Sequence, residues 1–84
     1  MKAYVLIKTQ ANMDIELVKQ IQKLPKVIEV HRLFGIYDII AEIGDYDLTR
    51  VRESVDEIRA LKGVFETITC LSADLDLDAS TTPM

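Results

Sequence analysis

The first half of the sequence resembles the second, and this internal repeat limits the folds that the chain can adopt. A shift of 37 positions places apolar residues of one half on apolar residues of the other: Val18 on Val55, Ile21 on Ile58, Leu24 on Leu61 and Val27 on Val64. Each half predicts a strand, an amphipathic helix and a second strand. Two such halves predict an α+β fold of the ferredoxin-like type, βαββαβ. We therefore expect a four-stranded antiparallel sheet with both helices on one face.

The first half begins with residues 3–9, a short apolar, β-branched and aromatic run that predicts a buried strand. Asn12 is the expected N-cap of the helix that follows. The helix should carry an apolar stripe that Ile15 extends: Leu17, Val18, Ile21 and Leu24. It should end before Pro25, because proline disfavours helical geometry at the preceding residue. Residues 27–34 predict the second strand.

The second half begins after a predicted hairpin turn at 35–36, which leads into a third strand over 37–43. Asp47 is expected to cap a second helix. The apolar positions of that helix are again three and four residues apart: Leu48, Val51, Val55 and Ile58. The helix should end just before Gly63, which is expected in the left-handed conformation common at helix ends. Residues 64–71 predict the fourth strand.

Strand alternation over 64–71 places apolar side chains on both faces of the sheet. One face holds Phe65, Thr67, Thr69 and Leu71, and the other holds Val64, Glu66, Ile68 and Cys70. The helices can cover one face, so we expect the open face to pack against the sheet of a second copy. On this pattern Cys70 is expected to be a buried structural thiol. His31 is expected to be a half-exposed strand residue.

The composition narrows the classes of function. A chain of 84 residues with one cysteine predicts a single domain without disulfides, whose small core favours oligomerisation. A formal charge of −4 without a basic cluster argues against direct binding of nucleic acid. One histidine and one cysteine argue against a structural metal site, and no cofactor is expected. Without a membrane-length apolar run or a separate signal segment, the expected location is the cytoplasm.

The C-terminal segment differs from the rest of the chain in composition. We expect residues 1–73 to form the folded domain and residues 74–84 to form an acidic tail. The tail begins with Asp74, Asp76 and Asp78, which alternate with leucines. It is expected to be solvated, or to dock its leucines on a neighbouring subunit.

Residues 34–38, Phe-Gly-Ile-Tyr-Asp, place a glycine, a phenol and a carboxylate between two predicted strands. One interpretation is a hairpin turn, with Gly35 at a positive φ and Asp38 capping backbone amides. The other interpretation is a pocket at the sheet end, where Gly35 exposes backbone groups and Asp38 pairs with a ligand's ammonium group. No set of nucleophile, base and orienting residue is evident, so no catalytic residue is predicted.

Four short elements carry a resemblance to a known family: Leu24-Pro25-Lys26-Val27, Gly35-Ile36-Tyr37-Asp38, Leu61-Lys62-Gly63-Val64 and Thr67-Ile68-Thr69. Together they closely resemble the effector-binding domain, or RAM domain, of the Lrp/AsnC (feast/famine) transcriptional regulators. The resemblance covers residues 3 to about 73. It implies a βαββαβ sandwich that dimerises through its sheets and assembles into rings, with small effectors, typically amino acids, bound between subunits.

The resemblance also implies a set of effector-binding residues: Gly35, Tyr37, Asp38, Thr67 and Thr69. Asp38 would meet the α-ammonium group, while the Gly35 backbone and the threonine hydroxyls would hold polar ends of the ligand. Two features depart from the family pattern. The chain starts at the first strand of the effector domain, so it resembles members that lack the helix-turn-helix. Phe34 stands where a small hydroxyl residue is common, and it is expected to reshape the pocket.

The leading hypothesis is an amino-acid effector-binding and oligomerisation module without its own DNA-binding domain, which acts on full-length Lrp/AsnC regulators through mixed oligomers. A second hypothesis is an oligomeric scaffold or protein-interaction module with a vestigial pocket. A third is a small ferredoxin-like enzyme, since this fold also carries catalysts. Contact between His31 and Asp38 would favour the enzyme.

Overall fold

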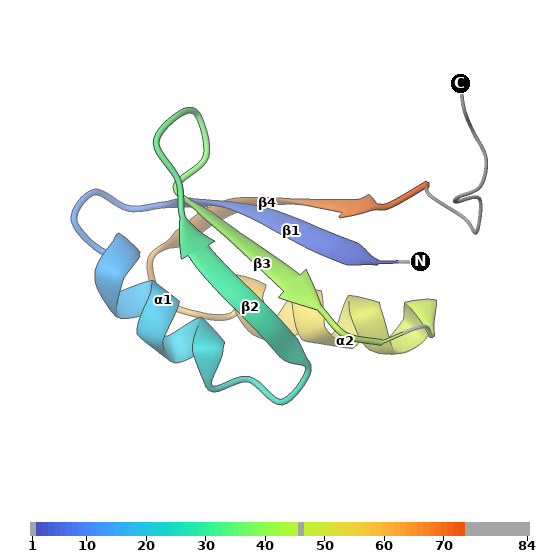
Figure 1. The fold of residues 1–84 in the computed structure, drawn as a ribbon. Coiled ribbons are helices and arrows are strands. Elements are labelled where there is room, and N and C mark those ends of the chain that lie inside the picture. The colour runs from blue at the N-terminus through green and yellow to red at the C-terminus, as the bar shows by residue number, and fades with distance from the viewer. Residues whose placement is uncertain (1, 46, 74–84) are drawn as a thin grey trace, which may run out of the picture.

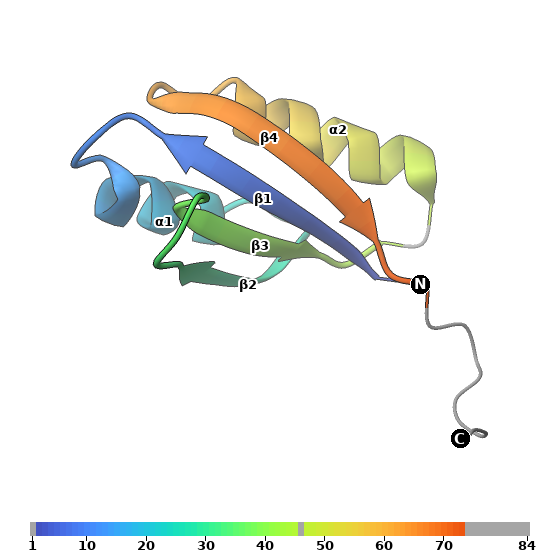
Figure 2. The same ribbon diagram turned by 90° about the horizontal axis from the view of Figure 1, so that it is seen from above.

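A computed structural model describes residues 2–45 and 47–73 of the chain. The elements follow the predicted order: β1 (Ala3–Thr9), α1 (Asp14–Gln22), β2 (Val27–Arg32), β3 (Ile39–Ile43), α2 (Leu48–Arg59) and β4 (Val64–Leu71) (Figure 1). The strands form one antiparallel sheet in the order β2-β3-β1-β4, which Figure 2 shows from above. The predicted ferredoxin-like α+β fold is confirmed.

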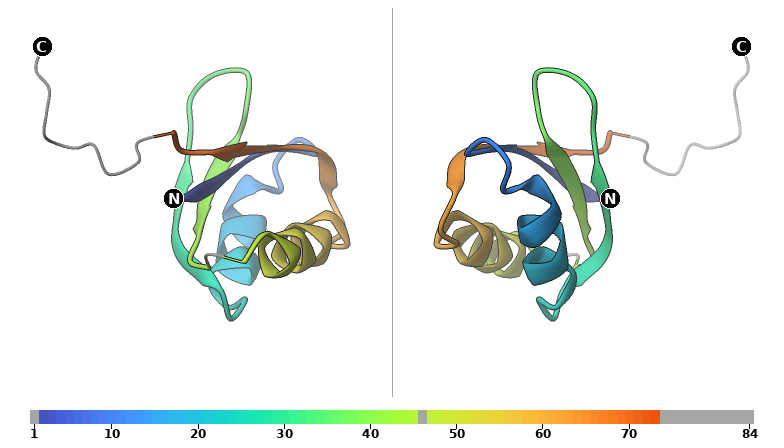
Figure 3. Two further views of the ribbon diagram at one scale, coloured as in Figure 1. Left: turned by 90° about the vertical axis from the view of Figure 1, so that its right-hand side faces the viewer. Right: turned by 90° about the vertical axis from the view of Figure 1, so that its left-hand side faces the viewer.

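Both helices lie on the same face of the twisted sheet (Figure 3). The α1 helix packs against β2 and β3, and α2 packs against β4. Alternate residues of β1 and β3 point towards the helices, so their side chains make up the centre of the core: Ala3, Val5, Ile7, Ile39, Ala41 and Ile43. The helices contribute the rest of their predicted stripes, chiefly Leu17 and Ile21 from α1 and Val51, Val55 and Ile58 from α2.

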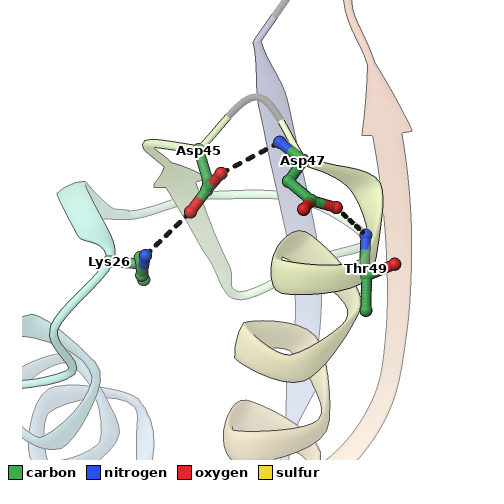
Figure 4. A network of polar contacts seen from close by, with 4 residues as sticks. All are labelled: Lys26, Asp45, Asp47 and Thr49. Atoms are coloured by element: carbon green, nitrogen blue, oxygen red, sulfur yellow. Dashed lines mark hydrogen bonds and ion pairs between the residues drawn. The ribbon is translucent and has the colours of Figure 1, made fainter.

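A polar network fixes the start of α2 beside the turn that leads from α1 into β2 (Figure 4). The Asp47 side chain accepts a hydrogen bond of 2.8 Å from the backbone N–H of Thr49, which confirms the predicted N-cap. Asp45 accepts from the backbone N–H of Asp47 at 2.9 Å and pairs with the Lys26 ammonium at 2.8 Å. The pKa of Asp45 is lowered, first by the hydrogen bond from Lys26 and then by that from Asp47.

The N-terminus of α1 differs from the prediction. Asn12 does not cap the helix: it has a φ of 67°, and Met13 is the N-cap residue, without a side-chain cap. Asparagine is among the few residues that tolerate the left-handed region, so the same side chain suits both positions. Ile15 is 53% exposed and Leu48 is 56% exposed, so neither extends the buried stripe of its helix.

The hairpin between β2 and β3 has a longer loop than predicted. β2 ends at Arg32 rather than residue 34, and β3 begins at Ile39 rather than residue 37. The loop projects from one end of the sheet (Figure 1). Leu33, Phe34 and Ile36 are apolar but exposed in this loop, and an apolar run on its own does not distinguish such a loop from a strand.

The open face of the sheet carries side chains from its central strands and from β4. Tyr4 pairs with Cys70 and Leu6 pairs with Ile68 across the β1–β4 ladder. Cys70 is exposed, so the prediction of a buried thiol is wrong for the single chain. His31 is also exposed on β2. A register irregularity after Lys8 places Thr9 opposite Val64.

The prediction of an acidic tail over residues 74–84 lies outside the residues that the structure describes.

No helix in the described part of the chain is both long enough and apolar enough to cross a membrane.

Candidate functional site

Asp38 links the hairpin loop to the end of β1. Its Oδ2 atom accepts hydrogen bonds from the Thr9 backbone N–H at 2.8 Å and from the Thr9 hydroxyl at 3.4 Å. Its backbone N–H donates to the carbonyl of Ile7, and its carbonyl accepts from the N–H of Leu33. This geometry agrees with the interpretation in which Asp38 caps a backbone amide. Because a carboxylate offers about four lone-pair sites, it can also hold a ligand donor.

Tyr37 lies over the open face of the sheet at the same end. Its hydroxyl donates to Oε2 of Glu66 at 3.3 Å, and the Lys8 ammonium lies 5.9 Å from the centre of its ring. Lys8 and Glu66 are opposite each other in the β1–β4 ladder. The pKa of the phenol is raised, first by its reduced contact with solvent and then by the Glu66 carboxylate. Tyr37 is thus a neutral hydrogen-bond donor near physiological pH.

Gly35 sits at the exposed tip of the loop. Its φ is +155°, and a Cβ atom built there would meet nothing within 4 Å. The backbone groups of Gly35 are therefore sterically accessible. Phe34 is fully exposed beside it, so in the single chain its ring extends into solvent. The prediction that Phe34 reshapes the pocket therefore concerns a pocket formed with a second copy, and the single chain does not test it.

The two threonines lie on the other face of the sheet. Thr67 is opposite Ile7 and Thr69 is opposite Val5, and both of these β1 partners are buried beneath the helices. Thr67 lines a surface hollow of about 340 Å³ near the C-terminal end of α2, and Thr69 lines a neighbouring groove of about 310 Å³. The structure thus brings Gly35, Tyr37 and Asp38 into one loop and places the threonines on the opposite face.

Sequence reasoning missed three residues that shape the loop site: Thr9, Lys8 and Glu66. Thr9 acts chiefly through its backbone N–H, which carries no signal in the residue type. Lys8 and Glu66 lie beside Tyr37 because of the register between β1 and β4, which the sequence pattern of either strand alone does not determine. His31 bonds to Glu29 at 2.9 Å rather than to Asp38, so the contact expected of an enzyme does not form.

Comparison with known proteins decides the family. Residues 2–74 match the model of the Lrp/AsnC ligand binding domain. The chain belongs to the Lrp/AsnC family. It is 31% identical over 67 residues to the HTH-type transcriptional regulator LysM of Saccharolobus solfataricus. This match covers 79% of the present chain and 47% of LysM. The Lrp/AsnC chain described here thus spans about half the length of the regulators that it matches.

One related protein is an enzyme by name. The Lrp/AsnC domain is 31% identical over 71 residues to the homocitrate synthase of Sulfurisphaera tokodaii. That match covers 83% of this chain and 15% of the synthase, so the shared part is a small fraction of that protein. The other relatives compared are transcriptional regulators, such as one from Pyrococcus furiosus that is 34% identical over 74 residues.

Solved structures share the Lrp/AsnC fold. TTHA0845 from Thermus thermophilus superposes with a TM-score of 0.80 and 35% identity, covering 84% of this chain and 90% of that one. The regulator NMB0573 from Neisseria meningitidis, solved as a complex with L-Met, has a TM-score of 0.77 at 18% identity. It covers 98% of this chain and 55% of that one, and at this identity the likeness concerns the fold.

Proposed function

We propose that this chain is an amino-acid effector-binding and oligomerisation module of the Lrp/AsnC family, which modulates full-length regulators. The observation that carries the proposal is the match of the whole described fold to the family's ligand-binding domain. The L-Met complex of NMB0573 supports amino acids as the ligand class. The homocitrate synthase match supports a module that also occurs apart from regulators.

In the proposed site, Asp38 receives the α-ammonium group of the ligand. The bond to Thr9 holds its carboxylate in place before the ligand arrives, which reduces the entropy lost on binding. The backbone N–H and C=O groups of Gly35 are exposed and can form hydrogen bonds with polar groups of the ligand. Tyr37 supplies a hydroxyl that, like an ordinary phenol, is protonated at physiological pH, and its pKa is raised further. A charged hydrogen bond to Asp38 should contribute about 1.5–3 kcal/mol.

The site requires a second copy to become enclosed. Asp38 and Tyr37 lie in the projecting loop, whereas Thr67 and Thr69 lie on the opposite face of the sheet. Within one chain the two sets of side chains face opposite sides of the sheet. We assign the threonines to the contribution of a neighbouring copy, so that binding and assembly are coupled. A ligand of this kind shifts the population towards the assembly that it binds more tightly.

The test is calorimetric titration of the full chain with each of the twenty amino acids, combined with multi-angle light scattering. We expect heat of binding from at least one amino acid and a change in the size distribution at saturation. The variant Asp38→Asn should remove the heat, while Glu57→Gln, on the exposed side of α2, should retain it. Absence of heat and of any size change for all twenty would contradict the proposal.

The scaffold with a vestigial pocket is the alternative, and the Asp38–Thr9 bond favours it, because it gives Asp38 a structural role that needs no ligand. The two functions differ in the behaviour of Asp38→Asn. If this variant assembles and modulates a full-length regulator as the parent chain does, the scaffold is correct. The modulation itself is tested by adding the chain to a purified Lrp/AsnC regulator of the same organism and measuring mixed oligomers by native mass spectrometry.

A further inference from the structure

A groove between α2 and β4 has an apolar floor and a basic rim. Its volume is about 310 Å³. The floor holds Val51 and Val55 and, at one end, Leu48 and Leu71, which are 56% and 43% exposed. The rim holds Arg52 and Arg59, against one acidic residue, Asp56. Val51 and Val55 are themselves buried, so the apolar surface open to an occupant is that of Leu48 and Leu71. Exposed leucines beside a net positive rim favour an apolar, acidic occupant.

The C-terminal sequence has this chemistry. Residues 74–78 read Asp-Leu-Asp-Leu-Asp. In an extended segment, alternate side chains point to opposite sides, so Leu75 and Leu77 share one side and the three aspartates share the other. The segment can thus present two leucines to a floor and three negative charges to a rim. Its charge is opposite in sign to the net charge of the groove residues.

The last strand, β4, ends beside this groove. Leu71, the last residue of β4, lines the groove, and the next residue is held in place by hydrogen bonds between Ser72 and Lys2 of 2.7 and 2.8 Å. Eleven further residues follow residue 73. At about 3.3 Å per residue they can extend roughly 36 Å, whereas the twelve residues of α2 span about 18 Å. The segment is long enough to turn back and follow the groove.

We propose that residues 74–79 occupy the α2–β4 groove of their own chain, with Leu75 and Leu77 on the floor and the aspartates beside Arg52 and Arg59. Tethering favours the chain's own groove, because a short linker gives an effective concentration of about a millimolar. Seated in this way, the segment covers Thr69, which lines the same groove. Any ligand or neighbouring subunit that uses Thr69 then has to displace it.

The test is a disulfide-trapping experiment in the full chain with Cys70→Ser, which removes the native thiol. Asp56→Cys in the groove is combined with Ala79→Cys in the segment. Ile28→Cys, an exposed position on β2, replaces Asp56→Cys in the matched control. We expect mild oxidation to link the groove pair at least about tenfold faster than the control pair. The product should have the mass of a single chain on a denaturing gel.

Two further variants test the chemistry of the contact. Adding Leu75→Ser with Leu77→Ser should reduce the rate of the groove pair to that of the control pair. Arg52→Gln with Arg59→Gln should slow it severalfold, whereas Arg50→Gln, outside the groove, should not. Equal rates for the groove and control pairs would overturn the proposal. A product with the mass of two chains would also overturn it, since the occupant would then be the segment of a second copy.

Discussion

The Oδ2 atom of Asp38 lies 2.8 Å from the backbone nitrogen of Thr9, and this contact joins the β2–β3 loop to the end of β1. The two residues are 29 positions apart, so the bond closes a long segment of chain around the edge of the sheet. The same carboxylate is the proposed receptor for an ammonium group. Its structural and binding roles can be separated by variants, because the first requires an acceptor oxygen and the second requires a negative charge.

Asp38→Asn and Asp38→Ala should therefore differ in stability but not in binding. Asparagine retains an acceptor oxygen for Thr9, so the free energy of unfolding should change little. Alanine leaves the Thr9 N–H without its partner and should cost about 1–2 kcal/mol. Both variants should lose amino-acid binding. Denaturant unfolding and calorimetry measure the two properties, and Asp38→Asn that binds as tightly as the parent would refute the charge-based role.

Gly63→Ala should destabilise the chain more than Gly35→Ala. Gly63 has a φ of +100°, and a Cβ there would lie 2.7 Å from the Sδ atom of Met13. Strain in the backbone alone costs about 1–3 kcal/mol, and the contact with Met13 adds to it. Gly35, with a φ of +155°, shares the backbone strain but faces open space, so its substitution meets no neighbouring atom and only the contact with Met13 separates the two variants. Urea unfolding of both variants measures the difference, and equal midpoints would contradict this account.

Asp45 should make stability depend on pH in the acid range. Its pKa is lowered by the hydrogen bond from Lys26, so its stabilising effect is present above the ordinary aspartate value of about 4. The effect is lost as the pH falls through the lowered value. The melting temperature of Asp45→Asn should thus lie below that of the parent at pH 7 and approach it below pH 4. Lys26→Gln should reproduce this pattern; a constant difference at every pH would argue against it.

Ile68→Asp should prevent dimerisation through the open face. Ile68 is 39% exposed and lies opposite Leu6 on that face, so a charge there would be buried in the proposed dimer. An unpaired buried charge is costly enough to dissociate a small interface. Ile15→Asp is the matched control, because Ile15 is exposed on α1. Light scattering should show a smaller particle for Ile68→Asp alone, and an unchanged mass would place the interface elsewhere.

The fold follows from the sequence wherever local patterns and tertiary packing agree. The bounds of β1 and β4 and the cap at Asp47 coincide with the predicted ones. The predicted N-cap of α1, Asn12, lies one position before the observed one, Met13, because an asparagine side chain suits both a cap and a left-handed residue. The sequence pattern places Phe34 in a strand, because an apolar residue carries no sign of whether other residues will cover it, and in this structure it is exposed.

The candidate site was predictable in its residues but not in its geometry. The sequence pattern identifies Gly35, Tyr37 and Asp38, and the structure places them together. The sequence pattern does not reveal that Asp38 accepts a hydrogen bond from a backbone N–H of β1, because any residue other than proline could supply that donor. It also could not show that the threonines face away from the loop, since that depends on the register between β1 and β4.

The sheet order has a consequence for how such a repeat can fold. Each half contributes two strands, yet β1 pairs with β3 and β4, while β2 pairs with β3. Within residues 2–45 and 47–73, neither half contains a pair of adjacent strands of its own. Fragments cut within the β2–β3 loop should therefore be unstructured apart and fold only when mixed. If the repeat arose from a duplicated gene, the ancestral half-length chain would have had to intertwine with a copy of itself to form a sheet at all.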